Sequence, residues 1–391
     1  MSQVYSAREK HLFAARRAFR APIKNEPEIR RQLVPGQYQN RSGRPGRSRN
    51  SPGTYPDSTT KAQGKNGPSK QVHAILRPRV TSAVAVDLTV HVGAVRLRNP
   101  ILAASGTFGY GIEFAHLVDL NRLGGLVVKG LSREPMEGAP APRLSETPSG
   151  MLNAVGLQNI GVRAFVAEKL PVLRKYDMAI VANIFGYCVE DYLEVIRILE
   201  DAEGLAAYEL NISCPNVKKG GMQFGGDPAL VAEVVGAARK AAAKRPLWVK
   251  LSPMVADIGL IARAAEAAGA NALTVANTYP AMAVDPWTGK SRLGNPTGGL
   301  SGPAIKPITL RLVWEASRAI TIPILGVGGI ETVADVLQYL AVGATAVQVG
   351  TASFTDPTIS QRLVEQLENA LFKVKAFTIS DMRGKISADF G

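Results

Sequence analysis

The chain of 391 residues lacks several features that mark common classes of protein. It has only two cysteines, which excludes a disulfide framework and favours a reducing compartment. No apolar run approaches the ~18 residues that a membrane-spanning helix needs. The four histidines do not cluster, and neither a strand–GxGxxG–helix unit nor a P-loop is present. The sequence therefore predicts a cytoplasmic protein with no membrane span, no metal site and no dinucleotide-binding unit of its own.

The first 85 residues also lack the material of a hydrophobic core. Residues 35–70 contain no Val, Ile, Leu, Met or Phe, so burial there cannot offset the chain entropy lost on folding. Residues 1–85 carry 17 Lys and Arg against 4 Asp and Glu, whereas the remainder carries 29 against 28. We predict a disordered basic extension over residues 1–85, with no catalytic role. Such a leader is also typical of a transit peptide, a nucleic-acid arm or an over-long gene start; nucleic-acid binding is not expected of the nearly neutral remainder.

What is present in residues 86–391 is a series of eight short apolar segments, each ending in polar residues or glycine. Runs of Val, Ile, Leu and Ala that alternate with helical periodicity are typical of a parallel sheet buried on both faces. Eight such units favour an α/β fold, a closed (β/α)₈ TIM barrel, as a single catalytic domain over residues 86–391. The segments are residues 101–106, 125–130, 179–186, 207–213, 247–253, 272–278, 323–329 and 346–352.

The connections between these segments are predicted in part. Helical periodicity covers residues 228–243, 257–268 and 332–341, and Asp227 before Pro228 is a good helix start. Alternation about a glycine over residues 87–97 predicts a β-hairpin that closes the bottom of the barrel. Two connections, residues 132–161 and 279–303, are longer than a helix needs. We expect them to form binding loops or lids over the top face.

Cys214 follows the fourth segment, where a barrel places active-site residues. A lone cysteine is usually a small buried hydrophobe, but the neighbours Asn211, Ser213 and Asn216 favour a base or nucleophile here. Further asparagines lie at or near other segment ends or in an inserted loop. Because an amide offers two donors and an acceptor without net charge, converging asparagines suit a flat ring such as a pyrimidine or a flavin. These further asparagines are Asn153, Asn183 and Asn277.

Lysines and glycines end the other segments. Lys129 and Lys250 end the second and fifth, where a buried ammonium is costly unless it meets an anion or reaches solvent. A carboxylate, a phosphate or a reduced flavin would supply the anion. Gly328-Gly329 and Gly350-Thr351 follow the last two segments, where bare backbone amides beside a helix start form the usual phosphate site of a barrel. Ser105 and Gly302 offer further close approaches.

Four motifs together resemble dihydroorotate dehydrogenase over residues 87 to about 372. They are LNAVGLQN at 152–159, NISCPNV at 211–217, NT at 277–278 and GGLSGPA at 298–304. Cysteine at position 214 is similar to the class 1 enzymes, and KKGGMQFG at 218–225 resembles the class 1B catalytic subunit. The chain departs from the family pattern in two places. The basic extension is foreign to the family, and Tyr279-Pro280-Ala281 replaces a glycine-containing stretch that is usual in class 1B.

The resemblance implies FMN at the top of the barrel and oxidation of dihydroorotate to orotate in de novo pyrimidine biosynthesis. It implies that Cys214 removes the C5 proton while C6 passes hydride to FMN. The implied cofactor contacts are Ser105, Lys129, Gly130, Asn183, Asn211, Lys250, Ala276, Gly302, Gly328, Gly329, Gly350 and Thr351. The implied substrate contacts are Lys129, Asn153, Ala154, Val155, Gly156, Leu157, Asn211, Asn216, Asn277 and Thr278.

The resemblance also implies a homodimer that associates with a subunit carrying FAD and an iron–sulfur cluster, through which electrons reach NAD. That arrangement agrees with the missing dinucleotide motif. Two alternatives stay open on the residues alone: an oxidoreductase acting on another dihydropyrimidine, and a non-redox synthase or lyase that uses the glycines to bind a phosphorylated substrate while Cys214 is structural. A third interpretation makes the basic extension a nucleic-acid binder attached to an enzyme.

Overall fold

The computed structural model describes residues 86–213, 215–216 and 222–386, which belong to one unit of the chain spanning Pro78–Gly391. The predicted extension over residues 1–85 and the predicted base Cys214 lie outside the described residues. Residues 215, 216, 222 and 223 are described only as backbone, so the predicted substrate contact Asn216 is located by its backbone alone.

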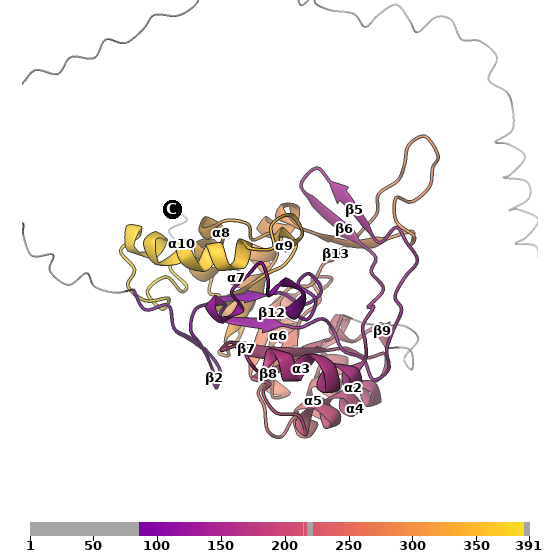
Figure 1. Cartoon of the computed structure of the whole chain (residues 1–391), viewed down its shortest axis with the longest axis horizontal. Coiled ribbons are helices and arrows are strands. Elements are labelled where there is room, and N and C mark those ends of the chain that lie inside the picture. Colours follow the sequence, from indigo (N-terminus) through magenta and orange to yellow (C-terminus); the bar gives the residue numbers. More distant parts are fainter. Residues whose placement is uncertain (1–85, 214, 217–221, 387–391) are drawn as a thin grey trace, which may run out of the picture. The chain divides into compact units, whose positions relative to one another are not determined.

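Eight parallel strands close into a barrel, and helices surround it (Figure 1). The strands follow one another around the ring in chain order, and the last pairs with the first to close it. Most of their residues are buried, as in a sheet covered on both faces. The predicted TIM barrel is confirmed, with one strand in each predicted segment. The strands are β3 (Ile101–Ala103), β4 (Gly125–Val127), β7 (Ala179–Ile184), β8 (Ala207–Asn211), β11 (Leu247–Lys250), β12 (Ala272–Val275), β15 (Ile324–Val327) and β16 (Ala346–Val349).

Amphipathic helices make most of the crossovers, and their apolar faces pack on the barrel. The three predicted helices are confirmed as α5 (Pro228–Ala241), α6 (Ile258–Ala267) and α8 (Val333–Ala341), and Asp227 caps α5 by accepting hydrogen bonds from two backbone N–H groups. The other helices are α2 (Val162–Ala164), α3 (Leu170–Leu173), α4 (Val189–Glu200), α7 (Lys306–Ala319), α9 (Ala352–Thr355) and α10 (Ile359–Lys373). Short turns are η1 (Ile112–Phe114), η2 (Leu120–Arg122), η3 (Phe165–Lys169), η5 (Phe224–Gly226) and η6 (Pro303–Ile305).

The predicted hairpin is present as β1 (Val90–Val92) and β2 (Val95–Leu97), paired antiparallel. Its inward side chains are buried, and those of Val92 and Leu97 are fully so. Gly93 turns the hairpin with φ +62°, and a Cβ there would lie 3.3 Å from the carbonyl oxygen of Asn271, just before β12 begins. The hairpin therefore covers the N-terminal end of the barrel, as predicted.

The two long connections pair with each other, which the sequence did not reveal. They form a four-stranded antiparallel sheet in the order β13 (Tyr279–Ala281), β14 (Gly298–Ser301), β6 (Gly150–Asn153) and β5 (Leu144–Thr147). In Figure 1, β5 and β6 stand out from the barrel near β13. Leu152, Ala154 and Leu293 form a small apolar cluster of their own beneath this sheet. Both connections reach the top-face cavity, as expected of binding loops, but their pairing into a second sheet was not predicted.

A short antiparallel ribbon, β9 (Pro215–Asn216) paired with β10 (Met222–Gln223), follows β8.

Among the described helices, none has both the length and the apolar character needed to cross a membrane.

Candidate active site

A cavity of about 430 Å³ opens at the C-terminal ends of the barrel strands. All eight strand ends contribute to its lining, and the inserted sheet supplies a wall through β6 and β14. Every residue implied to contact the cofactor lies in this lining: Ser105, Lys129, Gly130, Asn183, Asn211, Lys250, Ala276, Gly302, Gly328, Gly329, Gly350 and Thr351. The implied substrate contacts Asn153, Ala154, Val155, Gly156, Leu157, Asn277 and Thr278 also line it. Barrel closure thus brings together residues that are up to 246 positions apart, from Ser105 to Thr351.

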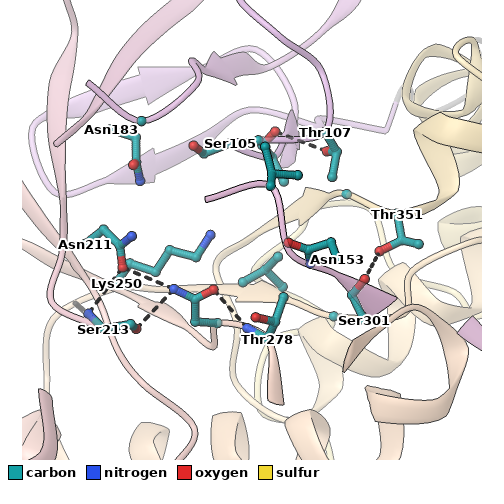
Figure 2. A pocket seen from close by; sticks show the side chains of 18 of the residues that line it. Ser105, Thr107, Asn153, Asn183, Asn211, Ser213, Lys250, Thr278, Ser301 and Thr351 are labelled. Carbon is teal, nitrogen blue, oxygen red and sulfur yellow. Dashed lines mark hydrogen bonds between the residues drawn. The ribbon is translucent and has the colours of Figure 1, made fainter. Parts of the chain in front are cut away.

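Asn277 fixes one side of the cavity through hydrogen bonds to Asn211, Ser213 and Thr278, and these three partners are labelled in Figure 2. Its Nδ2 donates to Asn211 Oδ1 at 3.1 Å and to Ser213 Oγ at 3.0 Å, while its Oδ1 accepts from the backbone N–H of Thr278 at 2.9 Å. Asn211 Oδ1 is thereby occupied, so the Nδ2 group of Asn211 is the atom left for a ligand. Tyr192 donates to the backbone carbonyl of Asn211 at 2.8 Å and holds this strand end from behind.

The inserted sheet holds Asn153 at the cavity wall. Asn153 Nδ2 donates to the carbonyl oxygen of Gly299 at 3.1 Å, across the pairing of β6 with β14. A Cβ at Gly299 would lie 2.2 Å from Thr278 Oγ1, so only glycine lets β14 pass this close to the barrel rim. The pairing of the two insertions therefore fixes Asn153 beside residues from the end of β12.

Two lysine ammonium groups face the cavity without an anion. Lys250 is 7% exposed, and its ammonium group has no hydrogen bond or ion pair in the described part of the chain. Lys129 likewise has no ion-pair partner there, and burial, with the positive charge of Arg143 as a second cause, lowers its pKa. Because a buried cation without a partner is costly, these side chains fit a site that binds an anion.

Bare peptide groups line the side of the cavity that β15 and β16 form. Gly329 has φ +66°, and a Cβ there would lie 2.7 Å from the carbonyl oxygen of Gly302. Tyr339 donates to the carbonyl oxygen of Gly328 at 2.6 Å. Since C=O and N–H point in opposite directions across a trans peptide, this bond fixes the orientation of the Gly329 N–H.

Gly350 differs from these glycines. A Cβ at Gly350 would meet only ordinary van der Waals contacts, the nearest at 3.6 Å from Ala104 Cβ. The protein itself therefore leaves room for a side chain there, and its absence keeps the backbone open to a ligand. With two unpartnered lysines and several amides, this surface fits a phosphate-bearing flat ring such as FMN. The described residues contain no cluster of His, Cys, Asp and Glu suited to a metal ion.

A buried carboxylate beneath the cavity was not predicted. Glu209, fully buried in β8, accepts hydrogen bonds from Asn183 Nδ2 at 2.8 Å, Thr274 Oγ1 at 2.7 Å and Gln348 Nε2 at 2.6 Å. Part of the signal was available, because Thr274 and Gln348 are each the single polar residue of an otherwise apolar strand, and Glu209 lies in the middle of buried β8. The lining residues Thr107, Met151, Gln158, Phe185, Ser301, Ile305 and Phe354 were not predicted either.

Comparison with known proteins agrees with this geometry. The sequence profile of the family described as dihydroorotate dehydrogenase matches residues 87–371. A protein of Solibacter usitatus, provisionally named dihydroorotate dehydrogenase A (fumarate), is 56% identical over 300 residues, which are 77% of this chain and 98% of the relative. Proteins named dihydroorotate dehydrogenase B (NAD(+)), catalytic subunit, are 50% identical in Pelobacter propionicus (77% of this chain, 98% of the relative) and in Trichlorobacter lovleyi (76% and 98%). The chain therefore belongs to the dihydroorotate dehydrogenase family.

Proposed function

We propose that this chain oxidises dihydroorotate to orotate with FMN, in the cytoplasm, as a step of de novo pyrimidine biosynthesis. The observation that carries the proposal is the single cavity in which unpartnered lysines, asparagine amides and bare glycine peptides converge. The family match supports the same reaction. A phosphate site alone would suit the synthase or lyase alternative, but that alternative does not account for the asparagine amides that converge in the same cavity and suit a flat ring.

The cofactor part of the cavity is assigned to the barrel-strand ends and the glycines. Gly328, Gly329, Gly350 and Thr351 would hold the phosphate of FMN through backbone N–H groups. Lys250 would offset negative charge on the ring, and Asn183 would hydrogen-bond it. Ser105, Gly130, Ala276 and Gly302 would allow close approach. FMN, when bound, supplies the acceptor for a hydride.

The substrate part lies toward the inserted sheet. Lys129 would pair with the carboxylate of dihydroorotate, which gives its half-buried ammonium an anion. Asn153, Asn211 and Asn277, together with Thr278 and the 154–157 loop, would hold the amide edges of the ring, and Asn216 would complete the set. Bound in this way, the ring would be held in one orientation.

Cys214 would act as the base. It follows Ser213, which lines the cavity and bonds Asn277, and precedes the β9–β10 ribbon. Its thiolate would remove the C5 proton as C6 loses hydride to the cofactor, which leaves a C5–C6 double bond and a neutral thiol. A free thiol has a pKa near 8.5, so the amide-rich surroundings must favour the thiolate.

The electron acceptor is NAD in our proposal, reached through a partner subunit that carries FAD and an iron–sulfur cluster and associates with a homodimer of this chain. The B-type names of several relatives support it. Fumarate is a second candidate, because the 56% identical relative carries that acceptor in its name.

Anaerobic spectroscopy tests both the proposed reaction and the proposed electron acceptor. The purified protein should be yellow, and dihydroorotate should bleach its visible flavin band while dihydrouracil does not. Protein without flavin, or bleaching by dihydrouracil alone, would refute the reaction. Reoxidation of the bleached protein by fumarate without a partner would favour the second candidate, whereas reoxidation by NAD only with the partner subunit supports the first.

A further inference from the structure

Glu209 is a fully buried carboxylate one layer below the floor of the cavity. It lies two residues before Asn211 on β8, so both side chains point into the barrel. Its hydrogen-bond donors come from three other strands: Asn183 on β7, Thr274 on β12 and Gln348 on β16. Among the described residues, no Lys or Arg nitrogen forms an ion pair with it. A charge buried in this way is costly for stability alone.

Glu209 is the acceptor in all three of these hydrogen bonds. Its Oε1 accepts from Asn183, and its Oε2 accepts from both Thr274 and Gln348. A carboxylate only accepts, so the Asn183 atom facing it must be the amide nitrogen. Asn183 Oδ1 is thereby turned toward the cavity, where a Cβ on the lining residue Gly130 would lie 3.0 Å from it. Figure 2 shows Asn183 at the upper edge of the site.

We propose that Glu209 is a positioning residue that fixes the Asn183 amide with its carbonyl oxygen toward the cavity, so that the site selects a hydrogen-bond donor of the FMN ring at this point. The inference rests on the proposed function, because it takes FMN as the occupant. Glu209 does not touch the ligand. It acts by removing one of the two orientations that an amide otherwise has.

Glu209→Gln tests this orientation. The glutamine oxygen should turn to the side with two donors, Thr274 and Gln348, which leaves its NH₂ group facing Asn183. Asn183 then turns over and presents its own NH₂ group to the cavity. FMN affinity, measured on apoprotein by quenching of FMN fluorescence, should fall about tenfold or more, the loss that follows when a buried bond becomes a donor–donor contact. FMN affinity within about threefold of wild type would overturn the proposal.

A cycle of variants shows whether the effect passes through Asn183. In an Asn183→Ala background, E209Q should change FMN affinity by less than about threefold, because the amide that it reverses is gone. An equal loss in both backgrounds indicates a merely structural role and overturns the proposal. Glu200→Gln is the matched control: Glu200 is a largely buried carboxylate bonded to Tyr208 Oη at 2.8 Å, outside the cavity lining. It should leave FMN affinity unchanged.

A rescue variant covers the case in which E209Q does not fold. In E209Q/Q348E the carboxylate moves to position 348 and attracts the NH₂ group of the new glutamine, whose oxygen then faces Asn183 as in wild type. This variant should fold and bind FMN within about threefold of wild type, whereas lost FMN binding in a folded protein overturns the proposal. Failure of the proposed function would appear elsewhere, as a wild-type protein that does not bind FMN. Coupling seen with orotate but not with FMN would overturn the assignment of Asn183 to the cofactor.

Discussion

Buried cations at the two ends of the barrel are treated in opposite ways. At the N-terminal end, Arg245 donates to Tyr208 Oη at 2.9 Å and to the carbonyl oxygen of Leu205 at 3.1 Å, and it pairs with Glu200 at 3.7 Å. At the C-terminal end, Lys250 is more deeply buried than Arg245 but has no such partner among the described residues. The first arrangement satisfies its own charge and stabilises the fold. The second leaves a charge for a ligand to neutralise.

Two buried tyrosines show the same difference between the ends of the barrel. Tyr208 and Tyr339 are both fully buried, and burial raises the pKa of each phenol well above its ordinary value. Tyr208 bonds Glu200 beside Arg245, whereas Tyr339 bonds the Gly328 carbonyl behind the cavity. Equivalent chemistry thus serves stability at one end and the orientation of a binding peptide at the other. The following predictions test that division.

The largest effect is expected from Cys214→Ala. Removing the proposed base should lower the rate of flavin reduction by dihydroorotate about a thousandfold, within the range of general acid–base catalysis. FMN and orotate affinities should stay within a few-fold of wild type, because neither needs the thiol. Stopped-flow reduction under anaerobic conditions measures the rate. Cys188→Ala is the control, since Cys188 lies outside the cavity lining, and undiminished reduction in C214A would refute the assigned role.

The second prediction compares the two cations directly. Lys250→Met should lower FMN affinity about a hundredfold, because a buried hydrogen bond from a charged donor to the flavin ring is lost, yet leave the free energy of unfolding of the apoprotein unchanged or higher. Arg245→Met should do the reverse and lower that free energy by about 3 kcal/mol, since Glu200 is left buried without its cation. Urea unfolding and FMN titration of both variants give the four values. Equal destabilisation by the two substitutions would contradict the division of roles.

The barrel itself was predictable because the apolar composition of each strand indicates that the strand is buried. Eight apolar runs with helices between them leave few other folds, and their ends fix which residues meet. The inserted sheet was not predictable in the same way. Leu152 pairs with Leu300, 148 positions later, through four-residue strands rich in glycine, and nothing local indicates that pairing. The apolar character of β8, β12 and β16 also hid the contacts of Glu209, because only closure of the ring brings Thr274 and Gln348 to it.

The candidate site likewise has features that could be predicted from the sequence and features that could not. Lining residues at strand ends could be predicted from position alone, whereas the direction in which an amide points depends on partners far along the chain. Asn183 was identified from its place at the end of β7, but its orientation follows from Glu209. Cys214 lies outside the described residues, so its place opposite the cofactor stays a prediction.

A smaller effect is expected from Tyr339→Phe. The variant frees the Gly328 carbonyl, so the Gly329 N–H is no longer held in one orientation, and FMN affinity should fall about five- to tenfold. Tyr208→Phe is the matched substitution at the other end of the barrel. It should leave FMN affinity unchanged and lower the free energy of unfolding by about 1 kcal/mol. A fall in FMN affinity in Y208F of the same size would remove the distinction between the two ends.

The smallest effect is a pH dependence that arises at Lys129. Burial, with Arg143 nearby, lowers the pKa of Lys129 below 10.5, so between the lowered value and 10.5 the unfolded chain binds more protons than the folded one. The apoprotein should therefore become more stable as pH rises through that window. Orotate affinity should move in the opposite direction, because the carboxylate needs the protonated ammonium, with at most about a tenfold loss per pH unit above the folded pKa.

Lys129→Met separates this lysine from other titrating groups. The variant should bind orotate more weakly at neutral pH, and its orotate affinity should no longer fall through the alkaline window. Lys250→Met, tested with saturating FMN, should keep the alkaline fall, since Lys129 is unchanged in it. Equilibrium titration of orotate against the flavin spectrum gives these values. The same alkaline slope in K129M and wild type would show that the orotate carboxylate meets another cation, and the lysines of the cavity would then need a different assignment.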